Sequence, residues 1–344
     1  MSRFIQLHCL TSYPPSNLNR DDMGRPKTAV MGGVNRLRIS SQSQKRAWRT
    51  SEIFESALGD WKGTRTKRVG LEVEQDLLAG GIDESEAAKW AAAIAEQFGK
   101  LKKDSLEIEQ LAHIAPEEWE QIRTLARTLA AERRAPNEDE LALLRARPKA
   151  VDIALFGRML ASNPAFNVEA AAQIAHALTV HAVTVDDDYF TAVDDLNQYQ
   201  EDGGAAHIGE TGFGAGVFYL YVCLNRELLT DNLQGDTPLA NKTIAALMEA
   251  MAKVSPTGKH NSFASRAYTS YVLAEKGNQQ PRSLSVAFLK PVTGSDQLGS
   301  AIKLLKTQCE NFDKVYGPCA DSRRTLNAVS GEGSLEDLIQ FATE

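Results

Sequence analysis

The sequence lacks the cysteine pairs, long apolar runs and leader features that define several classes of protein. Its four cysteines are Cys9, Cys223, Cys309 and Cys319. None belongs to a CxxC pair, which argues against a zinc ribbon or a disulfide scaffold and favours a reducing compartment. No apolar run reaches the roughly 18 residues of a membrane helix, and the N-terminal residues have no long apolar core. We therefore expect a cytoplasmic protein that is neither secreted nor bound to a membrane.

Signatures of catalysis and of metal binding are also missing. The six histidines form neither an HxxxH pair nor a cluster with cysteine, and we interpret each of them, His176 and His181 included, as a core or surface residue. There is no GxSxG motif and no P-loop, and the GFGAG run at 212–216 precedes a predicted strand instead of opening a helix. The sequence thus predicts no catalytic residue, no metal site and no cofactor.

Positive charge is missing from one stretch and concentrated in another. Residues 159–225 contain no Lys or Arg but nine acids, whereas residues 1–50 contain nine Lys and Arg and two acids, a net charge of +7. The whole chain carries −7, which taken alone argues against a nucleic-acid partner. This segregation indicates a polyanion site in 1–50 and self-complementary contacts elsewhere, although chance clustering or charge balance within one fold would also produce it.

Hydrophobic periodicity predicts an α+β fold of ferredoxin-like type, an antiparallel sheet with helices. Ile5, Leu7 and Cys9 alternate with Gln6 and His8, which predicts a strand with one buried face. Strands are predicted at 4–10, 217–224, 267–274 and 283–289, a long loop at 11–36, and helices at 42–58, 168–180, 237–254, 296–311 and 335–342. A separate helical subdomain is predicted at 60–149, with helices beginning near Asp83 and Pro116 and a third at 138–146.

The run VNRLRISSQSQKRAWR at 34–49 predicts a helix start that binds phosphate. Ser41 and Gln44 form a capping-box pattern, and the unpaired N–H groups of such a helix end favour an anion. Lys45 and Arg49 lie four residues apart on one face, close to the hydroxyl and amide groups of 40–43. This set suits a phosphodiester backbone, although an ordinary capped helix with a solvated basic face gives the same pattern.

Two further segments admit more than one interpretation. The adjacent Asp21 and Asp22 could hold a divalent metal for phosphodiester cleavage, but a loop turn or pairing with Arg is favoured because adjacent side chains rarely converge on one ion. Tyr189, Phe190 and Phe166 flank an acidic, glycine-rich loop at 181–216. They could stack on bases or wedge between them, or they could anchor the loop to the core.

Several motifs together resemble the CasC-type backbone subunit of Cascade, the type I-E CRISPR surveillance complex. They are LNRDDM (18–23), GGVNRLRISSQSQKRAWR (32–49), VDIALFGRM (151–159), IAHALTVH (174–181), YFTAVDDL (189–196), AAHIG (205–209) and GVFYLY (216–221). Their colinear order makes the combination specific, whereas any single motif would not be.

The resemblance implies an RRM-like palm at 1–59 and 150–344, helical fingers at 60–149 and a β-hairpin thumb at 181–216. It implies a non-catalytic protein whose copies polymerise head to tail along the spacer of the guide RNA (crRNA), kink it periodically and present it to target DNA in an R-loop during antiviral defence. The implied partners are crRNA, target DNA, further copies of the chain, the large and small subunits, the 5′-handle-capping subunit and the repeat-processing endoribonuclease subunit.

The resemblance also assigns roles to residues. Contacts to the guide are expected from Arg20, Lys27, Arg38, Ser40, Gln42, Lys45, Arg46 and Arg49. Phe190 with Thr191 is the preferred candidate for the kink, and Phe166 stands near a wedge position of the family. Candidates for target DNA are Arg133, Arg134, Arg145, Arg147 and Lys149, which a solvated helix face would explain equally well. In related backbone subunits an acid in the loop after the first strand cleaves bound target RNA, so the alternative function is a metal-dependent endoribonuclease using Asp21 or Asp22.

Overall fold

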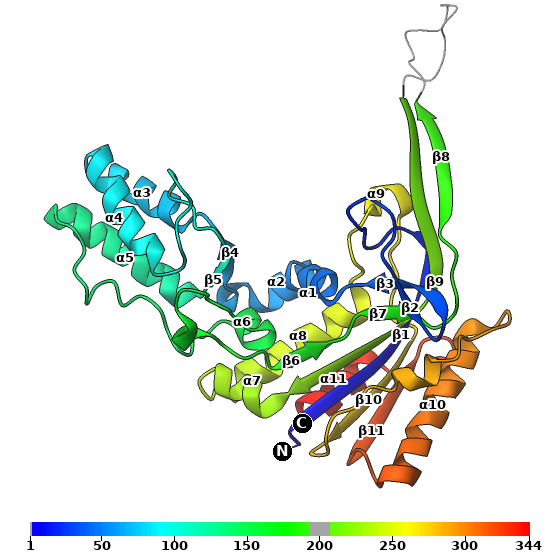
Figure 1. Ribbon diagram of the computed structural model, residues 1–344. Helices are drawn as coiled ribbons and strands as arrows, with labels where there is room; N and C mark the ends of the chain where they lie inside the picture. The colour runs from blue at the N-terminus through cyan, green and yellow to red at the C-terminus, as the bar shows by residue number, and fades with distance from the viewer. Residues whose placement is uncertain (1, 193–206) are drawn as a thin grey trace, which may run out of the picture. The chain divides into compact units, whose positions relative to one another are not determined.

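The computed structural model describes residues 2–192 and 207–344 and combines helices with an antiparallel sheet (Figure 1). The chain forms two compact units. The first, called the sheet unit here, comprises Met1–Ser51, Ile174–Cys223 and Leu247–Glu344. The second, the helical unit, comprises Glu52–Gln173 and Leu224–Ala246. The predicted α+β class is confirmed.

The main sheet follows the order β11-β10-β1-β9-β7-β3-β2. These strands are β1 (Phe4–Ser16), β2 (Thr28–Met31), β3 (Val34–Ile39), β7 (Ala177–Thr179), β9 (His207–Asn225), β10 (Tyr271–Gly277) and β11 (Ser322–Asn327). The short strands β6 (Ala172–Ile174) and β8 (Asp186–Ala192) both pair with β9. Beyond the sheet, β8 and the first half of β9 continue as a two-stranded ribbon (Figure 1).

The remaining elements are mostly helical. The α-helices are α1 (Ser41–Arg49), α2 (Glu52–Leu58), α3 (Val69–Ala79), α4 (Glu84–Glu96), α5 (Pro116–Glu132), α6 (Val151–Phe156), α7 (Arg226–Asn232), α8 (Thr237–Lys253), α9 (His260–Phe263), α10 (Gln297–Tyr316) and α11 (Leu335–Thr343). Three 3-10 helices, η1 (Gly59–Trp61), η2 (Pro164–Phe166) and η3 (Ser285–Phe288), and a small β4–β5 sheet (Thr64–Thr66, Ala112–Ile114) complete the fold. Among the described helices, none is both long and apolar enough for a membrane span.

The main sheet is buried on both faces, so the expectation of one buried face for β1 is wrong. On one face α10 packs through Leu305 and Cys309 against Tyr271 and other apolar side chains of the sheet. On this face the polar side chain of His8 is buried as well, because Tyr219 OH lies 2.9 Å from His8 Nδ1 and Glu275 Oε2 lies 3.1 Å from His8 Nε2. Satisfied hydrogen bonds allow polar side chains to occupy core positions.

A buried charge cluster stabilises this same face. The carboxylate of Glu275 is fully buried and accepts from Arg282, at 2.5 and 2.9 Å, and from Arg323 Nε at 2.7 Å. Arg323 in turn pairs with Asp313 of α10 at 2.6 Å. Burial opposes ionisation of Glu275, but the hydrogen bonds from His8 and Arg282 outweigh it and hold the pKa of the carboxyl below its usual 4.5.

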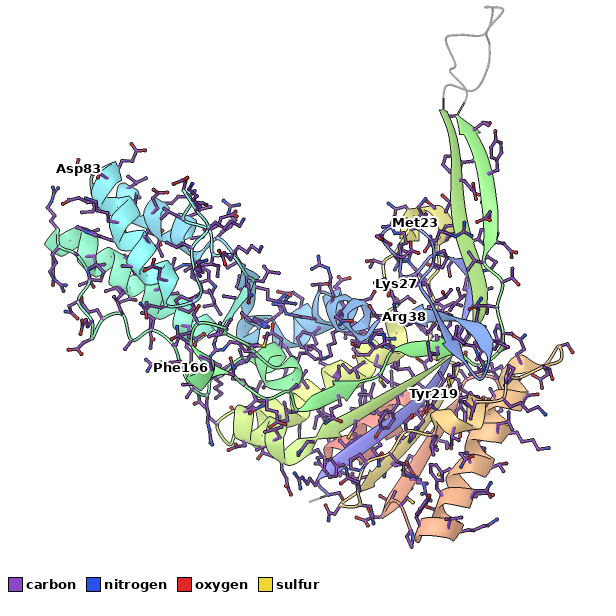
Figure 2. All side chains as sticks on the ribbon, viewed as in Figure 1. Met23, Lys27, Arg38, Asp83, Phe166 and Tyr219 are labelled. Carbon is purple, nitrogen blue, oxygen red and sulfur yellow. The ribbon has the colours of Figure 1, made fainter. Side chains whose placement is uncertain are left out.

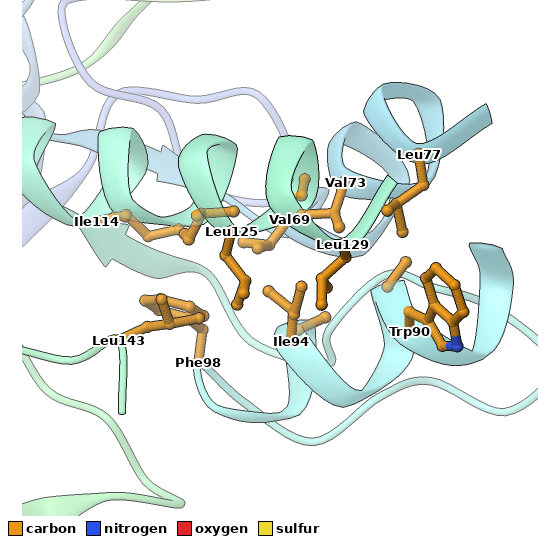
Figure 3. Packing of buried hydrophobic residues seen from close by; sticks show 14 of the residues in the cluster. Val69, Val73, Leu77, Trp90, Ile94, Phe98, Ile114, Leu125, Leu129 and Leu143 are labelled. Carbon is orange, nitrogen blue, oxygen red and sulfur yellow. The ribbon is translucent and has the colours of Figure 1, made fainter. Parts of the chain in front are cut away.

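The helical unit has its own apolar core between α3, α4 and α5 (Figure 3). Trp90, Ile94 and Phe98 fall on one face of the α4 segment at helical spacing, as the sequence predicts, and all are buried. A fully buried ion pair lies at the edge of this core, where Arg158 Nη1 contacts both carboxylate oxygens of Glu118 at 2.8 and 2.9 Å.

The predicted helix 42–58 is interrupted, and its cap is Ser40 instead of Ser41. The Ser40 side chain accepts from Ser43 N at 3.3 Å, whereas the expected partner Gln44 is buried. The helix ends after Arg49 because Thr50 Oγ1 and Ser51 Oγ bond carbonyls of the preceding turn, at 2.8 and 2.7 Å. Such side-chain bonds compete with continuation of the helix.

Three other sequence-based elements are wrong. The alanine-rich segment 168–180 forms β6 and β7 instead of a helix, because tertiary pairing with β9 and β3 overrides local propensity. Residues 138–146 form turns, with Arg145 N bonded to Glu118 Oε1 at 2.8 Å instead of to a helical carbonyl. The predicted strand 283–289 contains η3, since Leu284 and Phe288, four residues apart, are both buried under α10.

The expected loop 11–36 is also more ordered than predicted. It contains the second half of β1, which runs to Ser16, then β2 and the start of β3. The helices predicted at 237–254, 296–311 and 335–342 are confirmed as α8, α10 and α11, which begin at Thr237, Gln297 and Leu335.

Candidate nucleic-acid interface

Backbone hydrogen bonds join the loop 17–27 to β3 and to the start of α1. Lys27 N donates to Asn19 O at 2.8 Å, and Arg38 N donates to Lys27 O at 2.8 Å. Ser40 N donates to Asn19 Oδ1 at 2.8 Å, and Asn17 Nδ2 reaches Gly212 O of β9 at 2.9 Å. These bonds join neighbouring segments of the chain into one continuous surface of the sheet unit, which we call the basic surface. It comprises loop 17–27, β3 and α1.

Four cations of the basic surface have no carboxylate partner among the described residues. They are Arg20, Lys27, Arg38 and Arg46. Arg20 and Arg46 are exposed, while Lys27 and Arg38 are half-buried beside the base of the β8–β9 ribbon (Figure 2). Unneutralised, partly desolvated cations attract a polyanion more strongly than ion-paired ones.

Helix α1 adds the remaining predicted contacts. Gln44, Ala47 and Trp48 point into the core, so the opposite side of the helix is available to a ligand. On that side Gln42 is exposed, and Lys45 and Arg49 are half-buried. Desolvation lowers the pKa of Lys45. Ser40 itself is buried, and its hydroxyl accepts from Ser43 N as the helix cap.

Three basic residues counted in 1–50 do not belong to this set, and the first of them, Arg3, precedes β1. Arg36 is fully buried and donates to the carbonyls of Met31, Thr179 and Phe288 at 3.2, 3.0 and 3.0 Å. Arg25 pairs with Asp187 of β8 at 2.9 Å. Charge counting along the sequence therefore overestimates the number of cations available to a ligand.

Asp21 has a turn-forming role, which was the favoured of its two interpretations. Its Oδ1 accepts from Met23 N at 3.0 Å and from Arg25 N at 2.9 Å. Asp22 is exposed beside it. In the described ranges, no group of three or more His, Cys, Asp or Glu side chains is placed to hold a metal ion.

The β8–β9 ribbon presents two aromatic side chains. All β8 residues are exposed, with Tyr189 at 66% and Phe190 at 41%. Phe190 pairs across the strands with Gly209, and a Cβ at that glycine would overlap its ring, so the ring lies across β9. Thr191 is exposed next to it. The acids 194, 195, 201 and 202, and most of the predicted thumb tip, lie outside the described residues.

Phe166 belongs to the helical unit, whereas Phe190 belongs to the sheet unit. Phe166 lies in η2, half-buried against the apolar core of the helical unit (Figure 2). Its carbonyl accepts from Arg158 Nε at 3.2 Å and Nη2 at 3.1 Å. For Phe166, this position agrees with the interpretation that the side chain packs on the core and does not stack on bases.

The five DNA candidates separate into two groups. Arg134 pairs with Glu132 and Glu140, Arg147 with Asp231 at 2.8 Å, and Lys149 with Asp236 at 2.8 Å. The side chains of Arg133 and Arg145 are exposed and have no carboxylate partner in the part of the chain that the structure describes. Only these two are available to an external phosphate without breaking an ion pair.

The structure adds two residues that the sequence did not indicate. His176, between β6 and β7, has its Nδ1 at 2.9 Å from Arg38 Nη1. Lys259 Nζ donates to Thr211 Oγ1 at 2.9 Å, and its neighbour Gly258 packs so closely on the Leu18 carbonyl that no side chain would fit there. His176 lies in the motif at 174–181, which gives no sign of a contact with Arg38, and Lys259 lies in none of the motifs; only the folded chain brings these two segments to the basic surface.

A surface with four cations that have no carboxylate partner among the described residues, beside a ribbon with exposed aromatic side chains, defines the class of protein as one suited to an extended polyanion. The chain belongs to the family of CT1975-like proteins, whose family model matches residues 5–341. No curated protein matches it in sequence.

Two solved structures are similar over the whole chain. One, described as "CRISPR RNA-guided surveillance complex, pre-nicking", is 31% identical with a TM-score of 0.85 and coverage of 99% of each chain. Another, described as "CRISPR RNA-guided surveillance complex", is 27% identical with a TM-score of 0.74 and the same coverage of both chains. The resemblance to Cascade subunits indicated by the sequence motifs is thereby confirmed.

Proposed function

We propose that the chain is a non-catalytic backbone subunit of a type I-E Cascade complex in the cytoplasm, where it binds crRNA and presents it to target DNA. The observation that carries this proposal is the basic surface, on which Arg20, Lys27, Arg38 and Arg46 lack carboxylate partners among the described residues. Guide contacts with sugars and phosphates are assigned to these residues together with Ser40, Gln42, Lys45 and Arg49. Phosphate contacts of this kind hold RNA without reading its sequence.

The RRM-like palm is assigned to 1–59 and 150–344, the fingers to 60–149 and the thumb to 181–216. An open sheet face is not available for base stacking, since α10 covers one face and Cys9 on the other face contacts Met251 of α8 at 4.0 Å. RNA therefore binds along the loop 17–27 and α1. Phe190 and Thr191 on the ribbon kink the guide, because an exposed aromatic face stacks on any base.

Copies of the chain assemble head to tail, and the acids of β8 contribute to their register. Asp187 is already paired with Arg25 of its own chain, whereas Asp186 and Asp188 are exposed without such a partner among the described residues. Reversal of Asp186 and Asp188 to Lys is expected to weaken stepwise assembly on RNA at low salt. Asp187→Lys is the matched variant, since it breaks the pair with Arg25 of the same chain instead. Unchanged assembly of the variant with Lys at both 186 and 188 would contradict this assignment.

The decisive experiment is to purify the chain with its co-expressed complex, extract and size the nucleic acid, and measure the mass of the assembly. We expect RNA of one length, several copies of the chain per RNA, and association with the large, small, 5′-handle-capping and repeat-processing subunits. RNA of random lengths would instead identify a general single-strand binder.

A cleavage assay separates this function from the endoribonuclease alternative. The assembled protein is incubated with complementary target RNA and magnesium. Intact RNA is expected, because Asp21 is committed to the loop turn. Regularly spaced cuts that disappear in Asp21→Ala or Asp22→Ala would overturn the non-catalytic assignment.

A further inference from the structure

An exposed histidine lies directly against the cations of the basic surface. The β3–β7 register pairs Arg38 with Leu178 and Ile39 with Ala177, which places His176 at the end of β7 beside Arg38. The ring Nδ1 is 2.9 Å from Arg38 Nη1. Arg38 also donates to Thr28 O at 3.4 Å, and Lys27 is linked to Arg38 through the backbone. His176 and Arg38 are therefore in direct side-chain contact, and Lys27 is close enough to act on the ring electrostatically.

The contact fixes the protonation state of the histidine. A guanidinium group has only donors, so His176 Nδ1 must accept, and the ring is neutral with its proton on Nε2. Desolvation, Arg38 and Lys27 together lower the pKa of His176 below 6.5. These two cations act on the ring, Arg38 from β3 and Lys27 from the loop before β2.

An anion bound at His176 and Arg38 would favour the protonated form of the histidine. A phosphate oxygen that accepts from Arg38 Nη1 replaces His176 Nδ1 as the acceptor and places negative charge beside the ring. Nδ1 can then take a proton from solvent and donate to the same phosphate, since opposite charge favours the charged form of a titrating group. Hydrogen bonds from the guanidinium and the imidazolium to the anionic phosphate join two charged groups and are stronger than the single bond from Arg38 to the neutral ring that they replace.

We propose that His176 is a proton-linked phosphate contact, so that each subunit takes up a proton at His176 when a guide phosphate binds between it, Arg38 and Lys27. This inference rests on the proposed function and identifies an additional residue of its RNA site. RNA affinity consequently increases as the pH falls from about 8 to about 5.5, the range in which histidine titrates. A rise of one unit in the pKa of His176 corresponds to about tenfold in affinity.

The test measures binding of the full chain to one synthetic single-stranded RNA between about pH 5.5 and about pH 8 at constant ionic strength. Wild type is expected to bind about tenfold more tightly at the acidic end. His176→Gln should bind with the wild-type affinity of the alkaline end at every pH, and His176→Lys with that of the acidic end. His260→Gln is the matched control, because His260 is a partly exposed histidine of the same unit without a contact to Arg38.

The outcomes distinguish this inference from the function on which it rests. A pH dependence that survives in His176→Gln, or that disappears in His260→Gln, overturns the inference while leaving the RNA-binding function intact. Weaker binding of His176→Lys at all pH values also overturns it. Failure of wild type to bind RNA overturns both. Calorimetry in two buffers of different ionisation enthalpy should show proton uptake by wild type that His176→Gln abolishes.

Discussion

Several basic side chains of the helical unit are paired with acids, whereas four cations of the basic surface in the sheet unit are not paired among the described residues. In the helical unit, Arg158 is buried against Glu118, and Arg134, Arg147 and Lys149 pair with carboxylates near the surface. In the sheet unit, the four cations of the basic surface have no such partner in the described ranges. A cation that is already neutralised contributes to the fold, whereas one left without an acid attracts a ligand. Pairing, not the number of basic residues, is therefore the basis on which we assign the proposed RNA site.

The largest expected effect concerns the buried pair of the helical unit. Arg158→Ala leaves the Glu118 carboxylate buried without its partner and should lower the free energy of unfolding by about 3–5 kcal/mol. Urea unfolding followed by circular dichroism measures it. Arg147→Ala, which removes an exposed pair, is the matched control and should cost about 0.5 kcal/mol or less. Equal losses for the two variants would remove the distinction between structural and surface cations.

The sheet unit has a buried carboxylate of its own, and its effect depends on pH. Glu275→Gln should destabilise the protein by about 3 kcal/mol at neutral pH, since it leaves Arg282 and Arg323 without their shared partner. The folded-state pKa of Glu275 is below its usual 4.5, so its stabilisation is present above that pH and is lost as the pH falls through the folded value. The difference in melting temperature between wild type and variant should therefore shrink below about pH 4.5, and a constant difference would argue against this role.

The next effect concerns RNA affinity instead of stability. Lys27→Ala and Arg38→Ala should each weaken RNA binding about tenfold, the loss of one charge-assisted contact, with unchanged melting temperatures. The slope of log K against log salt concentration should become shallower by about 0.7 for each cation removed. This change should be the same for unrelated guide sequences. Filter binding over a salt series checks this. A loss that depends on the guide sequence would indicate base recognition, and Arg147→Ala should leave binding unchanged.

Phe190 of the sheet unit and Phe166 of the helical unit differ in the same way as the cations of the two units. Phe190→Ala should weaken RNA binding by about 1–3 kcal/mol, the value of one stacked base, without lowering stability. Phe166→Ala should instead lower the melting temperature, because this ring packs on the core of the helical unit. Fluorescence of a base analogue in the guide would report the kink. Loss of the kink in Phe166→Ala but not in Phe190→Ala would reverse the two assignments.

The smallest effect concerns target DNA. Arg133→Ala and Arg145→Ala should each reduce DNA binding by the guide-loaded complex by about threefold, as expected for a screened surface contact. Arg147→Ala, whose guanidinium is already paired with Asp231, should have less effect. Gel-shift titration at low salt measures these changes. A larger loss in Arg147→Ala than in Arg133→Ala would show that ion pairing does not govern availability in this unit.

Sequence reasoning succeeded where one element carries its own signal. The α4 and α5 helices followed from apolar residues such as Trp90 and Ile94 at helical spacing, and the start of α1 followed from the polar residues around Ser40. It failed at 168–180, where alanines favour a helix in isolation but β3 and β9 provide strand partners. The prediction that Gln6 and His8 form an exposed face of β1 was also wrong. The hydrogen-bond partners that permit their burial are more than 200 residues away in the sequence.

By itself the sequence determined the α+β class, the concentration of positive charge in the N-terminal 50 residues and the resemblance to Cascade subunits. Only the tertiary structure decided which of those charges are available. It buried Arg36, paired Arg25 with Asp187 and brought His176 to within 2.9 Å of Arg38. The physical reason is that charge and periodicity are local properties of the chain. Desolvation and pairing depend instead on strands that come together only when the sheet forms.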